Sequence, residues 1–223
     1  MLFLWIFFDM WKFIKRLIYL FIILNILGIF WGRFFNPPIT ITQIQGWIKY
    51  GKLDRNYVPL NEMSDNIKLA VIASEDQNFF KHSGFDYKAI QRAIEHNKNK
   101  KSIQGASTIS QQTAKNIFLW NGGSWFRKGL EVIYTFIIEK VWNKDIILER
   151  YLNSIEMGQG VFGAEAAAHY YFNKSSKNLT KSEAAWIAAV LPSPRKYDPK
   201  NPTPYLKRKH AWILRQMNYM RLE

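Results

Sequence analysis

Two adjacent carboxylates, Glu75 and Asp76, follow an apolar run at residues 70–73 and open the segment SEDQNFFKHSGFD, residues 74–86. Carboxylates in apolar surroundings can be tuned toward proton transfer. An arbitrary Glu-Asp pair at a helix end is more often solvated or ion-paired. Here the apolar turn before Glu75 and the aromatic residues after it favour a general base, with Asp76 on the adjacent face as an ionised structural neighbour.

Hydroxyl and amide side chains crowd the segment GASTISQQTAKN, residues 105–116. They are too polar for a helix that packs on both sides, and an exposed helix start would contain more Lys and Glu. At a helix N-terminus such groups suit the binding of sugar hydroxyls or anionic oxygens. Together the two segments indicate carbohydrate chemistry, either the cleavage or the formation of a glycosidic bond.

A third cluster, RKGLE at residues 127–131, combines cations with a carboxylate. Arg127 and Glu131 are four residues apart and Lys128 and Glu131 three apart, so all three can share one helical face. A surface ion pair is the simpler interpretation. With Lys115 nearby, the cations could instead surround a pyrophosphate, and the carboxylate could hold their geometry or help to bind a divalent metal.

The composition predicts one sizeable domain with a packed core, because 48% of the 223 residues are hydrophobic. The formal charge of +14 calls for an anionic partner, which could be nucleic acid, a lipid surface or a phosphate-bearing substrate. The chain has no cysteine, which excludes disulfides and thiolate metal sites.

The N-terminal region is expected to anchor the chain in a membrane. Residues 17–32 carry no charge, and as a helix they span roughly 24 Å, slightly less than the ~30 Å hydrocarbon core. Lys12, Lys15 and Arg16 precede this segment, whereas only Arg33 follows it closely. The positive-inside rule then places residues 1–12 in the cytoplasm, 13–33 in the membrane and the remainder outside. A cleaved signal peptide is the alternative, but WGRFFNPPIT offers no small-residue cleavage site.

The rest of the chain predicts a mainly α domain. Residues 34–60 are expected to form a connector with weak strand tendency, and residues 61–223 the catalytic domain. Helix caps and apolar periodicity predict helices over residues 65–74, from 87 onward, and over 109–119, 125–141, 145–152, 181–191 and 205–222. A solvated loop is expected at residues 98–101.

Five segments resemble, in order and spacing, the five motifs of the peptidoglycan glycosyltransferases (glycosyltransferase family 51). They are SEDQNFFKHSGFD, GASTISQQTAKN, RKGLE, ILERYLN with GQGVFGAEAAAHYYF, and EAAWIAAVLPSP. A single anchor without a transpeptidase signature resembles the monofunctional members of this family rather than the bifunctional penicillin-binding proteins. The resemblance implies a lysozyme-like, two-lobed fold, with a smaller lobe that dips toward the membrane.

The resemblance also implies residue roles. Glu75 matches the base that deprotonates the 4-hydroxyl of the acceptor N-acetylglucosamine, which then attacks the donor's anomeric carbon with inversion and expels undecaprenyl pyrophosphate. Glu131 matches the glutamate that supports the pyrophosphate, sometimes through a divalent cation (Mg or Mn). The cations that match its neighbours are Lys115, Arg127 and Lys128. The positions that match the cleft lining are Asp76, Phe79, His82, Thr108, Gln111, Gln112 and Asn116.

The expected function is therefore the polymerisation of lipid II into glycan strands at the outer face of the bacterial inner membrane. The expected partners are lipid II, the growing strand, the membrane and other cell-wall synthesis and division proteins, without nucleic acid. A lipid-borne pyrophosphate substrate needs both an anchor and a cation cluster, whereas a soluble sugar hydrolase needs neither. Two alternatives are a lytic transglycosylase or lysozyme-like muramidase, and an inactive membrane-anchored scaffold, which would be expected to lack Glu75 or Glu131.

Overall fold

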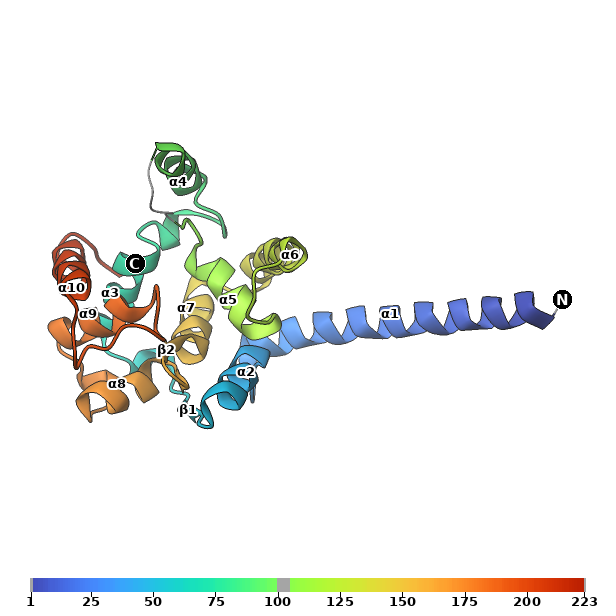
Figure 1. The fold of residues 1–223 in the computed structure, drawn as a ribbon, viewed down its shortest axis with the longest axis horizontal. Coiled ribbons are helices and arrows are strands. Elements are labelled where there is room, and N and C mark those ends of the chain that lie inside the picture. Colours follow the sequence, from blue (N-terminus) through green and yellow to red (C-terminus); the bar gives the residue numbers. More distant parts are fainter. Residues whose placement is uncertain (1, 100–104, 223) are drawn as a thin grey trace. The chain divides into compact units, whose positions relative to one another are not determined.

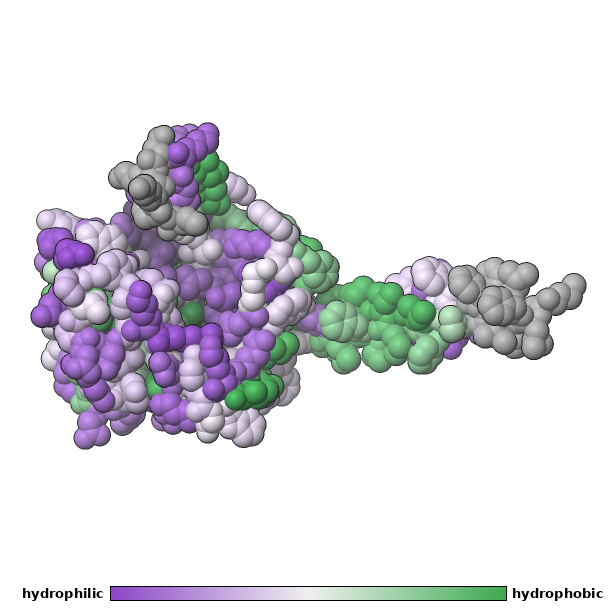
Figure 2. All heavy atoms as spheres, in the orientation of Figure 1, coloured by the Kyte–Doolittle hydropathy of each residue, from purple (hydrophilic) through white to green (hydrophobic). Residues whose placement is uncertain are grey.

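The computed structural model describes residues 2–99 and 105–222, and the chain divides into two compact units, Met1–Asn36 and Pro37–Glu223. The first unit is the single helix α1 (Leu2–Phe34) (Figure 1). Its segment Asp9–Phe34 is long and apolar enough to cross a membrane, and the hydrophobic side chains of this segment are exposed except for that of Ile29 (Figure 2). An exposed apolar helix of this length is consistent with the predicted membrane anchor.

The second unit is mainly α, as predicted (Figure 1). Its helices are α2 (Ile41–Tyr50), α3 (Asp65–Glu75), α4 (Tyr87–Asn99), α5 (Ile109–Phe118), α6 (Trp125–Val141), α7 (Lys144–Ser154), α8 (Ala164–Phe172), α9 (Lys181–Val190) and α10 (Pro204–Met217). Short 3-10 turns lie at Leu60–Glu62, Phe79–Lys81 and Ser176–Asn178. Three short strands, β1 (Asp54–Arg55), β2 (Glu156–Gly158) and β3 (Val161–Phe162), form a sheet in which β3 pairs in parallel with β1 and antiparallel with β2.

Capping side chains explain where several helices begin. Thr108 and Gln111 form a complete capping box at the start of α5, and Thr180 and Glu183 form another at the start of α9. Both boxes confirm the boundaries predicted from the sequence. The C-terminal helix is shorter than predicted, since α10 ends at Met217. The predicted loop at residues 98–101 is wrong for its first two residues, which belong to α4, while residues 100 and 101 lie outside the described part of the chain.

The prediction of weak strand tendency for the connector is confirmed only at residues 54–55, which form β1, and is wrong for residues 41–50, which form helix α2. Thr40 and Gln43 build a capping box that outweighs the strand preference of the β-branched residues around them. The helix packs closely on the domain: a Cβ added to Gly46 would lie 2.6 Å from Cζ of Phe162. Residues 37–60 therefore belong to the same compact unit as the helices that follow them.

Two groups of packed helices form the domain, α3 with α9 and α10, and α5 with α6 and α7 (Figure 1). Helix α3 is buried along residues 70–73, which is the apolar run that precedes the two carboxylates. The facing helix α9 contributes small buried residues, Ala184, Ala185 and Ala188, which allow the helices to approach closely. The core thus fixes the C-terminal end of α3, where Glu75 is the last helical residue.

Candidate active site

Glu75 is half-buried at the end of α3, and both of its carboxylate oxygens accept hydrogen bonds. Ser74 Oγ donates to Oε1 at 2.9 Å, and Gln112 Nε2 donates to Oε2 at 3.0 Å. Gln112 belongs to α5, so this contact joins the carboxylate segment to the hydroxyl-and-amide segment. The two motifs predicted to act on a sugar therefore meet at Glu75.

Tyr151 of α7 supports this arrangement through a hydrogen bond to Gln112. Its hydroxyl donates to Gln112 Oε1 at 3.2 Å. Burial raises the pKa of Tyr151 well above its usual value, and the charges of Glu75 and Asp76 add to the shift. Tyr151 therefore stays neutral and remains a donor, which orients the Gln112 amide toward Glu75. The role of Tyr151 was not predicted, although the residue lies within the motif ILERYLN.

Glu75 borders two adjoining pockets. The first has a volume of about 620 Å³ and lies between the end of α3, helix α4 and residues 105–108. The second has a volume of about 690 Å³ and extends past Gln112 to Pro192 and helix α10. A carboxylate between two pockets of this size can act on a bond that joins two bound groups.

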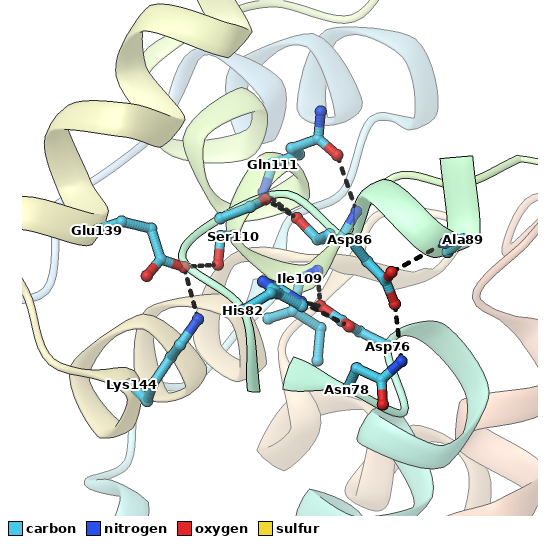
Figure 3. Close-up of polar contacts among 12 residues, drawn as sticks. Asp76, Asn78, His82, Asp86, Ala89, Ile109, Ser110, Gln111, Glu139 and Lys144 are labelled. Atoms are coloured by element: carbon cyan, nitrogen blue, oxygen red, sulfur yellow. Dashed lines mark hydrogen bonds and ion pairs between the residues drawn. The ribbon is translucent and has the colours of Figure 1, made fainter. Parts of the chain in front are cut away.

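Asp76 ties the end of α3 to the start of α5 (Figure 3). Its side chain is buried, accepts a hydrogen bond from the Ile109 backbone N–H at 3.0 Å and lies 2.9 Å from His82 Nε2. Ile109 is the first residue of α5, so this carboxylate holds Gln112 of the same helix within reach of Glu75. The geometry agrees with a structural role for Asp76.

Several residues expected to line the cleft are instead buried beneath it. Phe79 is 0% exposed, and Lys144 Nζ lies 4.6 Å from its ring centroid. Gln111 is occupied in the capping box of α5, and Asn116 Nδ2 donates to the Gln112 backbone at 2.8 Å. In this structure packing, capping and backbone hydrogen bonds engage these side chains, and their contact with substrate stays a prediction. The same holds for His82, whose side chain is buried against Asp76.

Thr108 both stabilises the fold and lies at a pocket wall. It caps α5 and donates through Oγ1 to the Gly84 carbonyl at 2.7 Å, yet it also borders the first pocket. Near it, Asn78 Nδ2 and the Ala89 backbone N–H each donate to Asp86 at 2.8 Å (Figure 3). Burial would raise the pKa of Asp86, but these hydrogen bonds, together with the charges of His82 and Arg92, outweigh burial and lower the pKa. Asp86 therefore stays ionised and holds the start of α4 at the pocket wall.

The cation cluster forms as the spacing predicted. Arg127 Nη1 lies 2.8 Å from Glu131 Oε2, and Lys128 Nζ forms an ion pair with Glu131 Oε1. Arg127 Nε also donates to the Gly122 carbonyl at 2.8 Å. Glu131 is only 3% exposed, so its charge must be compensated by these neighbours. One carboxylate thus orients two cations on α6.

Lys115 of α5 completes the cluster. Burial lowers the pKa of its ammonium group, and the charge of Glu131 opposes that shift. Three nearby cations lower the pKa of Lys115 further: Arg127, Lys128 and Arg195. Within residues 2–99 and 105–222 no carboxylate lies within 4.0 Å of Lys115 Nζ, so this cation remains available for an anionic ligand. Arg195, held by Glu156 at 2.8 Å, was not predicted as a neighbour, since it follows Lys115 by eighty positions.

The described residues hold no group of three or more His, Cys, Asp or Glu side chains placed to bind a metal. Both oxygens of Glu131 already bind cationic side chains, and the positive charges of these side chains would repel a divalent cation at this carboxylate. The residues of the cluster therefore fit an anion better than a divalent cation.

The chain matches the family model described as transglycosylase over residues 42–218. It is 55% identical over 181 residues to a biosynthetic peptidoglycan transglycosylase of Haemophilus influenzae, with 81% of this chain and 73% of the relative covered. It is 48% identical over 206 residues to the biosynthetic peptidoglycan transglycosylase of Pseudomonas fluorescens, covering 90% and 86% of the two chains. The corresponding Pseudomonas aeruginosa protein is 48% identical over 191 residues, with 83% and 82% covered.

Proposed function

Because the chain belongs to the transglycosylase family and is a peptidoglycan glycosyltransferase, we propose that it polymerises lipid II, with Glu75 as the general base. One observation carries the proposal: a hydrogen-bonded carboxylate between two pockets lies in the same domain as a cluster of cations with excess positive charge. The carboxylate suits removal of a proton from a sugar hydroxyl. The cation cluster suits an anionic leaving group.

In the proposed reaction Glu75 accepts the proton of the acceptor 4-hydroxyl. Its side chain reaches the border of both pockets while Ser74 and Gln112 fix its orientation. The deprotonated oxygen then attacks the anomeric carbon of the donor, the bond from that carbon to the pyrophosphate oxygen breaks, and the configuration inverts. A carboxylate that removes a proton from the attacking group needs no covalent intermediate.

The cation cluster is suited to the departing pyrophosphate. Lys115, Arg127 and Lys128 supply three positive charges and Glu131 one negative charge, which leaves an excess of two. A pyrophosphate diester carries about two negative charges, so the cluster complements it. The arginine can bind in a bidentate fork, while the lysines act as point charges. The residues of this cluster do not by themselves form a site for a divalent cation, since the pyrophosphate would have to supply most of the ligands of that ion.

An exposed apolar face on α6 supports a membrane-bound substrate. Trp125 is 92% exposed and Phe126 70% exposed, and Ile133 and Phe136 continue this face along the helix. Large exposed aromatic residues at one surface favour contact with lipid. With the anchor α1, this face favours a substrate presented in a bilayer. We propose the inner membrane, with the domain on its outer side, as the location.

Polymerisation is distinguished from cleavage by the choice of substrate. The full-length chain in detergent or vesicles is incubated with labelled lipid II and, separately, with labelled sacculi. We expect glycan polymer from lipid II and no soluble fragments from sacculi. Fragments from sacculi without polymer would instead show a muramidase or lytic enzyme, and no product from either would favour an inactive scaffold.

Lys115 is expected to set the alkaline limit of activity. Its pKa is lowered by burial, so it loses its charge at a lower pH than an ordinary lysine, and donor binding should weaken as pH rises through that pKa. In Lys115→Arg the guanidinium stays charged across the accessible range. We expect the alkaline limb of the kcat/KM profile to move up by about one pH unit or more. An unmoved limb would exclude Lys115 as the titrating group.

A further inference from the structure

Trp212 of α10 borders both pockets beside Glu75. The described residues common to the two linings are Ser74, Glu75, Gly105, Ser107 and Trp212. Trp212 is the member of this set with a large apolar side chain. It comes from a part of the chain that lies outside the five motifs.

Packing of α10 does not account for the position of this side chain. The helix buries Leu206, Ile213 and Met217 against the domain, whereas Trp212 is only half-buried at the edge of that face. Lys209, three residues earlier, places Nζ 4.9 Å from the Trp212 ring centroid and borders the second pocket. The indole is thus held at the pocket wall rather than within the core.

We infer that Trp212 is a substrate-binding residue that packs against a sugar ring at the point where donor and acceptor meet. The inference rests on the proposed function. A hexosamine ring presents an apolar face of C–H groups, and an indole offers a broad flat surface with little conformational entropy to lose. Polar groups in the same pockets, such as those of Ser107 and Gln112, suit the hydroxyl edge of the ring.

The junction position predicts an effect on catalysis as well as on binding. Glycosyl transfer requires the acceptor oxygen and the anomeric carbon to be held in a near-attack geometry. A platform that borders both pockets orients the two sugars relative to Glu75. Loss of the platform is therefore expected to lower kcat in addition to raising KM.

The test compares Trp212→Ala and Trp212→Phe in the full-length enzyme, with lipid II as substrate. We expect kcat/KM to fall about tenfold for the alanine variant and about threefold for the phenylalanine variant, which keeps a smaller aromatic face. The matched control is Trp186→Phe. Trp186 is also half-buried and stacks on His210 of α10 at 3.9 Å, but it borders neither pocket; kcat/KM should stay within about twofold of the parent.

A series of salt concentrations distinguishes packing of Trp212 on a sugar from an indirect effect in which Trp212 only positions the charge of Lys209. Packing predicts that the loss in Trp212→Ala persists from about 50 mM to about 500 mM salt, because ions screen charges and not apolar contacts. A loss that disappears at high salt, or a full-rate alanine variant, would overturn the inference while leaving the proposed function intact. A parent enzyme that makes no polymer would overturn the proposed function itself. If Trp212→Ala has a lower melting temperature than the parent, the kcat/KM of Trp212→Phe is used to test the inference instead.

Discussion

Glu75→Gln is expected to lower the rate of glycan polymerisation about 1000-fold, within the range that general-base catalysis supplies. Glutamine keeps the size of the side chain and an oxygen that can accept from Ser74 or Gln112. It loses the ability to take the proton of the acceptor hydroxyl. The measurement is the steady-state rate of polymer formation from lipid II, at saturating substrate.

Two controls belong with this variant. Its melting temperature should match that of the parent, because the fold around Glu75 depends on Asp76 and the α3 core rather than on the charge of Glu75. Glu62→Gln changes an exposed glutamate away from both pockets and should leave the rate unchanged. If Glu75→Gln retained more than about a tenth of the parent rate, the base would have to be another group.

Glu131→Gln is expected to reduce both stability and activity. Arg127 and Lys128 would lose the buried carboxylate that holds them. Removing one partner of a buried ion pair costs about 3 kcal/mol, because the remaining charge is left uncompensated. The excess of positive charge would rise, but the two cationic side chains would no longer be held in a fixed geometry. We therefore expect kcat/KM for lipid II to fall about 100-fold. Denaturant unfolding and steady-state kinetics measure the two effects.

Glu183→Gln is the matched control for this second variant. Glu183 also forms an ion pair, with Lys174 at 2.8 Å, but it caps α9 and lies away from both pockets. Glutamine can keep the capping box, so the loss of stability should stay below about 1 kcal/mol with unchanged activity. A Glu131→Gln enzyme that was destabilised yet kept its full kcat/KM would show that Glu131 only supports the fold.

Local sequence rules predicted the parts of this molecule that depend on near neighbours. The capping boxes at Thr108 and Thr180 fixed the starts of two helices, since cap geometry needs only four consecutive residues. The Arg127–Glu131 ion pair followed from its helical spacing. Helix α2 was missed because β-branched residues indicated a strand, whereas the capping box and the close contact of Gly46 with Phe162 stabilise a helix.

Contacts between distant segments could not be derived from the sequence. Motif membership did not reveal that Phe79 and Asn116 are buried, because burial depends on which helix packs on which. Tyr151, Arg195 and Trp212 reach the site from α7, the segment after α9, and α10. No local pattern links these positions to Glu75. Basic and aromatic residues on the expected C-terminal helix were the one available signal for Trp212.

In the proposed mechanism Glu75 acts as a base in a single displacement, and the leaving pyrophosphate departs toward the cation cluster. The most direct test is the anomeric configuration of the new glycosidic bond, determined by NMR on glycan that the full-length enzyme makes from lipid II. We expect a configuration inverted relative to that of the donor. Retention would require two displacements through a covalent glycosyl-enzyme, and would contradict the role of Glu75 as a base.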